Sequence, residues 1–212
     1  KVSYQAISPS SGSKFYWLEA MRGIAAIWVL LHHAAPSTDA FIGKFGSATI
    51  IENGYLGVDF FFVLSGFIIS YSVKVMEPRG VRVLDYLSLR AIRVYVPYLP
   101  VGIGMLLLYQ ILPGVSGSDR DVSAITSITL VPDFNPPALA VAWTLVHELI
   151  FYAVFAIWFY SRKALYAALF FWLILILVVY FGEMRLNRVS NYFFSPLNFC
   201  FMLGVCVQLL NE

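Results

Sequence analysis

Arg22 and His33 are the first residues along the chain whose types and spacing could serve chemistry. They lie eleven positions apart in an otherwise apolar run that ends in His32 and His33. On an α-helix, eleven residues rise about 16 Å in very nearly three turns, so both side chains share one face and His32 points about 100° away. Histidine is readily tuned to act as an acid or base near neutral pH. This spacing is compatible with catalysis, and the alternative is an interfacial histidine with a snorkelling arginine.

Two carboxylates, Asp59 and Glu148, lie in apolar runs where a membrane would make their charge costly. Asp59 lies near the outer end of the second run, at the depth expected of His33, and a carboxylate beside an imidazole can orient it. Glu148 lies roughly 15 Å inside the fourth run, near the midplane of a bilayer, and Thr144 precedes it by one helical turn. Both carboxylates could instead have structural roles. Asp59 would then be favoured by the helix dipole near the start of its helix, and Glu148 would pair with an arginine or a backbone group.

Arg90 and Arg93 form a third motif at the start of the third apolar run. They are three residues apart and share a helix face, so their guanidinium groups could clamp a phosphate. The alternative is that the two arginines only anchor the helix at the cytoplasmic side of the membrane, where Lys and Arg are enriched. We expect no metal ion and no tightly bound cofactor.

The composition indicates the elements that position these residues. The chain of 212 residues is 60% hydrophobic, 17% aromatic and 12% charged, whereas a soluble domain carries roughly 25% charged residues. With a net charge of +2 and no long basic run, nucleic acid is not an expected partner. We therefore predict an all-α, polytopic transmembrane helix bundle of about six helices, each near the length of about 20 residues that a bilayer requires. The candidate spans are Tyr16–Ala35, Tyr55–Met76, Ile92–Leu112, Ala138–Tyr160, Ala164–Phe181 and Tyr192–Leu210.

The distribution of cations predicts the orientation of these helices. Lys and Arg gather in connections that alternate along the chain, at residues 73–91 and 161–163, and such connections stay in the cytoplasm. Residues 1–15 would then be a cytoplasmic leader, and residues 16–212 one transmembrane domain. The longest external connection, Pro113–Pro137, is either a linker or a cap over an external cavity.

Together the motifs, in this order, resemble those of the acyltransferase 3 family of integral-membrane acyltransferases, which includes O-antigen, peptidoglycan and exopolysaccharide O-acetyltransferases. The family pattern R-x10-H matches Arg22 and His33, and R-x-x-R matches Arg90 and Arg93. The second-helix pattern matches GVDFFFVLSGF at Gly57–Phe67. The pattern W-S-L-x-x-E-x-x-F-Y matches Trp143, Leu145, Glu148, Phe151 and Tyr152, with Thr144 where Ser is usual. Family members usually have more helices than six, which leaves open whether residues 16–212 are truncated at their carboxyl end.

The resemblance implies a function and a role for each motif. An acyl group, most often acetyl, would pass from acyl-CoA to a hydroxyl of a carbohydrate such as the glycan of lipopolysaccharide. Arg90 and Arg93 would hold the donor phosphates, and His33, oriented by Asp59, would be the base or carry the acyl group. Arg22 and Glu148 would line the path, and the residues positioning substrate would be Trp143, Thr144 and Tyr152. The implied location is a bacterial inner membrane, with the amino terminus in the cytoplasm.

A proton-coupled transporter or permease is the competing interpretation. Arginine, histidine and carboxylate side chains buried in several helices are also typical of such carriers. Carriers often contain inverted repeats and broken helices, and the sequence contains no evident repeat. Labelling of an acceptor that depends on acyl-CoA would separate the two classes.

Overall fold

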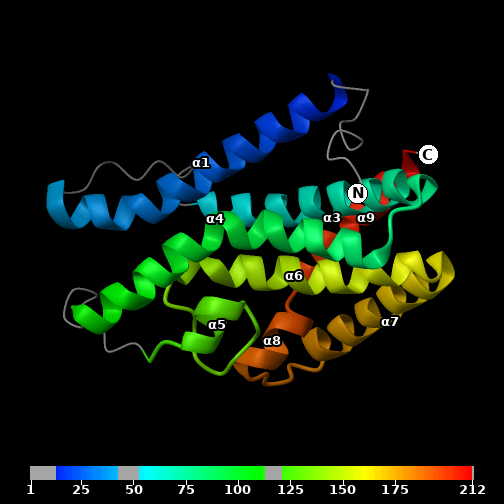
Figure 1. The fold of residues 1–212 in the computed structure, drawn as a ribbon. Coiled ribbons are helices and arrows are strands. Elements are labelled where there is room, and N and C mark those ends of the chain that lie inside the picture. Colours follow the sequence, from blue (N-terminus) through cyan, green and yellow to red (C-terminus); the bar gives the residue numbers. More distant parts are fainter. Residues whose placement is uncertain (1–12, 43–52, 113–120, 212) are drawn as a thin grey trace. The chain divides into compact units, whose positions relative to one another are not determined.

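The computed structural model describes residues 13–42, 53–112 and 121–211 (Figure 1). The chain divides into two compact units, residues 1–64 and 65–212. Of the predicted leader, residues 1–12 lie outside the described residues, and helix α1 begins at Ser13. The described ranges contain helices and irregular connections and no β-strand, which confirms the all-α prediction.

The first unit consists of α1 (Ser13–Ile42), the short 3₁₀ helix η2 (Asn53–Tyr55) and the beginning of α3 (Leu56–Met76). Two glycines let α1 approach the other elements closely. A Cβ on Gly54 would lie 2.5 Å from the Cβ of His32, and one on Gly57 would lie 2.7 Å from a methyl group of Val29. Any larger residue at either position would therefore force the helices apart, as expected of small residues at helix contacts in membranes.

The second unit contains the rest of α3 and six further α-helices, with short 3₁₀ turns between some of them. After α3 come η3 (Glu77–Arg79), α4 (Val83–Ile111) and α5 (Ala124–Thr129). The remaining elements are η4 (Ala140–Ala142), α6 (Trp143–Phe155), η5 (Ala156–Phe159), α7 (Arg162–Phe181), α8 (Arg188–Phe194) and α9 (Leu197–Leu210).

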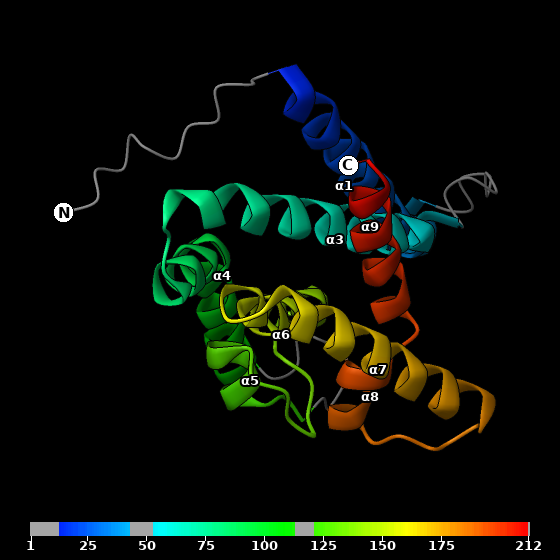
Figure 2. The ribbon, with the colours of Figure 1, turned by 90° about the vertical axis from the view of Figure 1, so that its right-hand side faces the viewer.

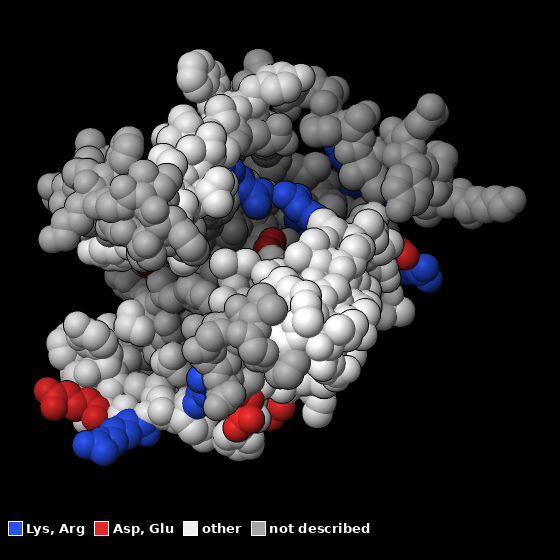
Figure 3. All heavy atoms as spheres, turned by 90° about the vertical axis from the view of Figure 1, so that its left-hand side faces the viewer, with Lys and Arg blue, Asp and Glu red and all other residues white. Residues whose placement is uncertain are grey.

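Five of the six predicted spans are confirmed within the described residues by helical segments long and apolar enough to cross a membrane. These are Asn53–Arg79, Val83–Ile111, Ala140–Phe159, Arg162–Phe181 and Arg188–Leu210. The predicted span Tyr16–Ala35 lies in α1, which has 30 residues but is not among the five. Its polar residues, among them Arg22, His32 and His33, lower the hydropathy of the segment. One face of the molecule is shown in Figure 3, where uncharged side chains predominate and charged ones form small groups.

Helix α4 begins at Val83, well before the predicted start at Ile92. An ion pair of 3.1 Å between Arg82 Nε and Asp85 Oδ2 holds its first turn. Arg90 and Arg93 consequently lie two turns and more inside a continuous helix instead of at its entrance.

The last predicted span is broken in two, which the sequence analysis missed. Helix α8 ends at Phe194, Ser195 is extended with ψ of 141°, and α9 starts after Pro196. Proline lacks an N–H and keeps the residue before it out of the helical region, which explains the break. The side-chain amide of Asn198 donates to the main-chain carbonyls of Tyr192 (3.0 Å) and Phe193 (2.8 Å), and so satisfies groups that the break would leave open.

The connection predicted as a linker or a cap contains the short helix α5, which is attached to α4. The Ser123 hydroxyl accepts from the Thr126 amide at the start of α5. From α4, the Tyr98 hydroxyl donates to the Ser127 carbonyl at 2.8 Å, and the Tyr95 hydroxyl donates to the Thr129 carbonyl. The described part of this connection is thus folded, and its role as a cap stays a prediction.

In the second unit α6 lies between α4 and α7, as the two ribbon views show (Figure 2). Helices α3 and α9 cross (Figure 2) and approach closely: a Cβ on Gly66 would meet the main chain of Phe201, and the Ser70 hydroxyl donates to Gln208 Oε1 at 2.9 Å. The ring of Phe201 also stacks on that of Phe151 in α6, with 3.4 Å between centroids. This packing fixes the helices that carry the candidate site.

Candidate functional site

In the first unit, α1 carries Arg22 and His33, and the first turn of α3 carries Asp59. His33 is exposed, and its Nδ1 lies 2.9 Å from the Val29 carbonyl oxygen. Because a carbonyl only accepts, Nδ1 must be the protonated nitrogen, which leaves Nε2 of the neutral ring as a free base. Asp59 is half-buried, and among the hydrogen bonds of the described residues none joins it to His33. The pairing of these two residues therefore stays a prediction.

In the second unit, the centre of the candidate site is Arg90, whose side chain is buried at 6% exposure. Its Nη2 donates to the Ser72 hydroxyl. The guanidinium carbon lies 5.2 Å from the centre of the Tyr152 ring and 5.7 Å from that of Tyr86. Its buried Nε has no hydrogen-bond partner within the described ranges. Helices α3, α4 and α6 thus enclose one cation.

This arrangement leaves the positive charge of Arg90 only partly compensated. No carboxylate forms an ion pair with it among the described residues, whose ion pairs involve Arg82 and Arg162 instead. Contacts with aromatic faces contribute about 2 kcal/mol or more each when they are desolvated, whereas burial of an ion costs several kcal/mol and is offset fully only when its hydrogen-bond donors are satisfied. An anion that reached the guanidinium, through Nε above all, would remove that cost.

Arg93 has a different environment from Arg90, although the two are on neighbouring turns. Its side chain is exposed, whereas that of Arg90 is buried. The two arginines therefore present one buried and one accessible cation to the same side of α4.

Glu148 and Tyr152 are joined directly along α6. The Tyr152 hydroxyl donates to Glu148 Oε1, while the face of the same ring contacts Arg90. Tyr152 is buried and Glu148 is half-buried. A carboxylate, a phenol and a guanidinium thus follow one another from α6 to α4, and the phenol could transmit a change of charge between the other two.

Thr144 and Trp143 lie on the first turn of α6, outside this chain of contacts. The Thr144 hydroxyl donates to the Val141 carbonyl at 2.9 Å. The Trp143 carbonyl accepts from Nδ1 of the buried His147 at 3.0 Å, and the two rings meet edge to face. Neither side chain has a hydrogen bond to Glu148 within the described ranges.

Sequence reasoning missed Ser72 and Tyr86, which contact Arg90. Tyr86 precedes Arg90 by four residues on α4 and so lies on the same helix face, a signal that could have identified it. Ser72 comes from α3, and no spacing in the sequence connects it with Arg90.

Comparison with known proteins gives a family assignment. A family model described as "Acyltransferase domain" matches residues 15–210. A curated relative from Rhizobium radiobacter, named "Protein 2 in picA locus", is 26% identical over 174 residues, which cover 72% of this chain and 86% of the relative. No solved structure matches. The chain belongs to the acyltransferase 3 family and is a membrane acyltransferase.

Proposed function

We propose that this membrane acyltransferase transfers an acyl group, acetyl in the simplest case, from acyl-CoA to a hydroxyl of a carbohydrate in a cell-surface glycan. The observation that supports the proposal is the buried guanidinium of Arg90, with an unpartnered Nε and no carboxylate facing it in the described part of the chain. Coenzyme A carries phosphates, and arginine binds phosphate oxygens with its planar fork. Arg93, exposed one turn further on, supplies a second cation for the same donor.

The reaction requires a base for the acceptor. Its hydroxyl oxygen attacks the thioester carbon, a C–O bond forms, the C–S bond breaks, and the CoA sulfur takes up a proton. Nε2 of His33 suits the removal of the hydroxyl proton, because the Nδ1 proton is held by the Val29 carbonyl. Asp59 would orient or stabilise the charged ring. Transient transfer of the acyl group to His33 is the alternative route.

In this proposal the remaining candidate residues position the substrates or supply charge along the path between them. Arg22 and Glu148 line the path between donor and acceptor, and Tyr152 holds the carboxylate of Glu148. Trp143 and Thr144, at the entrance of α6, position substrate.

The distribution of charge supports an orientation for the second unit. Cations gather where α3 ends and where α4 and α7 begin, and connections rich in Lys and Arg stay in the cytoplasm. These cations are Arg79, Arg82, Arg162 and Lys163. We infer that this end faces the cytoplasm of a bacterial inner membrane, with the amino terminus on the same side.

Replacement of Arg90 by methionine tests the donor site, because methionine keeps much of the side-chain length and removes the charge. Acetyl-CoA binding to the purified full chain is measured by titration calorimetry in a neutral detergent. Loss of a hydrogen bond to a charged group, about 1.5–3 kcal/mol, predicts affinity at least tenfold weaker. Arg188→Met, at the start of α8, is the matched control and should bind acetyl-CoA normally. Normal binding by a folded Arg90→Met variant would contradict the proposal.

A second assay addresses the chemistry. Vesicles with the protein receive acetyl-CoA and a glycan acceptor, and the mass of the glycan is measured. A mass gain that depends on acetyl-CoA and disappears in His33→Ala is expected. Proton uptake without any mass gain would instead favour the transporter interpretation, in which Glu148 would carry the proton and the fixed charge of Arg90 would influence it.

A further inference from the structure

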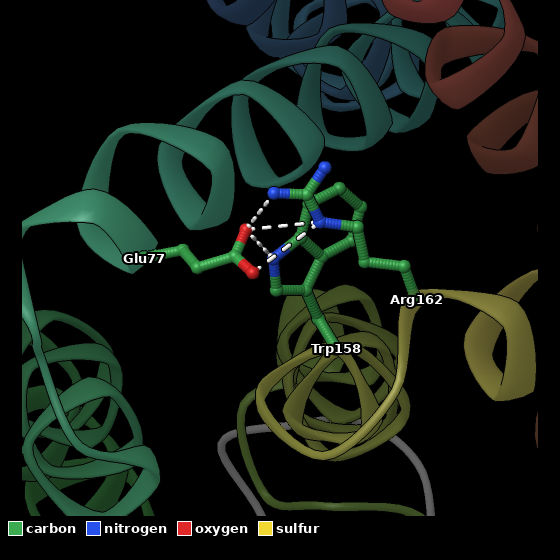
Figure 4. A network of polar contacts seen from close by, with 3 residues as sticks. All are labelled: Glu77, Trp158 and Arg162. Atoms are coloured by element: carbon green, nitrogen blue, oxygen red, sulfur yellow. Dashed lines mark hydrogen bonds and ion pairs between the residues drawn. The ribbon is translucent and has the colours of Figure 1, made fainter.

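Glu77, Trp158 and Arg162, none of which belongs to the candidate site, form a network where α3 ends and α7 begins (Figure 4). Arg162 Nε donates to Glu77 Oε2 at 3.0 Å, and Nη2 donates to the same oxygen. The indole N–H of Trp158 donates to this carboxylate too, at 3.0 Å. The Arg162 guanidinium also lies over the Trp158 ring, 5.0 Å from its centre.

The network holds an exposed arginine in one place. The Arg162 side chain is 57% exposed, whereas Trp158 below it is buried at 2% exposure. An exposed arginine usually samples many rotamers, and the conformational entropy lost when a ligand orders it opposes binding by up to about 2 kcal/mol. Here Glu77 and Trp158 already order it, and Figure 4 shows its remaining terminal nitrogen turned away from Glu77. The group is thus prepared to donate hydrogen bonds to a second acceptor.

The charges around Arg162 favour an anion. Lys163 follows directly in the chain. Arg162, Lys163 and Glu77 together carry two positive charges and one negative charge, a formal sum of +1. The single carboxylate of Glu77 therefore leaves this group with an excess of positive charge.

The place of Arg162 in the bilayer identifies which anion it meets. It is the first residue of α7, whose 20 residues rise about 30 Å, the thickness of the hydrocarbon core. Arg162 thus lies at the level of the lipid headgroups. Nearby, Tyr160 is 78% exposed, as is typical of the aromatic belt at that level.

We propose that Arg162 binds the phosphate of an anionic phospholipid headgroup, with Glu77 and Trp158 holding Arg162 in the geometry that binding requires. Glu77, Trp158 and Arg162 are not among the residues that contact Arg90, and lipid binding does not depend on acyl transfer. Clusters of cations next to membrane helices attract anionic lipids in this way.

Lipid retention by the purified full chain tests the proposal. Phosphatidylglycerol or phosphatidylcholine is added in a neutral detergent, and bound lipid is counted by native mass spectrometry. Wild type should retain phosphatidylglycerol in preference to phosphatidylcholine, and Arg162→Gln should retain about tenfold less, since charge-assisted bonds are lost. Arg82→Gln is the matched control, because Arg82 is also exposed and paired with an acid, Asp85. It should retain the lipid as wild type does, and an equal loss in both variants would overturn the proposal.

Glu77→Gln separates geometry from net charge. The change removes a negative charge, so attraction by charge alone would increase phosphatidylglycerol retention. If Glu77 orders Arg162 as proposed, retention decreases instead, and an increase would refute the role given to the network. Should Arg162→Gln not fold, Arg162→Lys replaces it: lysine keeps the charge, lacks the fork and should also reduce retention. Displacement of the lipid by millimolar acetyl-CoA would show that the site binds a soluble phosphate, which contradicts the proposal.

Discussion

Replacement of Tyr152 by phenylalanine tests the link between the two halves of the candidate site. The hydroxyl of Tyr152 donates to Glu148 Oε1, whereas its ring face contacts the guanidinium of Arg90 at 5.2 Å. Phenylalanine deletes the first interaction and keeps the second. The variant therefore separates the carboxylate from the cation without opening a cavity between α4 and α6.

The size of the effect follows from this geometry. A hydrogen bond to a charged group contributes about 1.5–3 kcal/mol, and a factor of ten in rate corresponds to about 1.4 kcal/mol. Glu148 is only half-buried, so water can replace part of the lost bond and the lower limit applies. We expect kcat to decrease about tenfold. Binding of acetyl-CoA should change by less than about threefold, because the contact with Arg90 is kept.

The assay compares Tyr152→Phe with Tyr86→Phe in nanodiscs, using labelled acetyl-CoA and a glycan acceptor. Tyr86 also contacts Arg90 with its ring, but its buried hydroxyl has no well-formed hydrogen bond within the described ranges. Tyr86→Phe should therefore keep the wild-type rate and be at least as stable. Equal rates for both variants and wild type would refute a role for the Glu148 contact. Acetyl-CoA binding reduced as strongly in Tyr152→Phe as in Arg90→Met would refute the separation of roles.

Three further predictions concern the stability of the second unit. Gly66→Ala would place a Cβ against a main-chain carbonyl of α9, so we expect a loss of about 1–3 kcal/mol in a denaturant titration, and an unchanged midpoint would contradict the packing. A double-mutant cycle on Ser70 and Gln208 should give a coupling of about 0.6–1.7 kcal/mol, and zero coupling would exclude their hydrogen bond as a stabilising contact. The Ser123 hydroxyl and a main-chain amide donate to Asp133 and hold the pKa of its carboxyl below its usual range. Ionised Asp133 therefore stabilises the fold at pH values above its ordinary pKa of about 4. This stabilisation is lost as the pH falls through the lowered pKa. Thermal melts of Asp133→Asn should accordingly differ from wild type at pH 7 and converge with it in acid.

The sequence was sufficient for features that depend on composition and local spacing. The lengths of the apolar runs identified five spans, because a helix must contain about 20 mainly apolar residues to cross the hydrocarbon core of a bilayer. Position in the fourth apolar run identified Glu148, and the family pattern identified Tyr152; the two side chains are joined one turn apart on α6. Arg90 was identified as a candidate, but its burial was not, because burial depends on which helices surround it.

The remaining features depend on contacts between distant segments or on breaks within a span. Ser72 reaches Arg90 from another helix, and no periodicity in either segment encodes that meeting. The break at Pro196 lies within an apolar run that averages as one span, so hydropathy conceals it. Whether His33 and Asp59 act together stays a prediction, because the described contacts do not join them.

The broken last span separates two properties that usually agree in membrane proteins, ease of insertion and stability of the fold. Helix α8, with seven residues, rises about 10 Å and α9, with 14, about 21 Å, so neither crosses a 30 Å core alone. Asn198, 1% exposed, is unfavourable for entry into lipid, yet its amide serves two carbonyls at the junction. Leucine at position 198 would insert more readily, but it would remove the side-chain donor of the Tyr192 carbonyl and leave the Phe193 carbonyl with the Trp172 indole N–H alone. At this residue, selection for a foldable chain opposes selection for an easily inserted one.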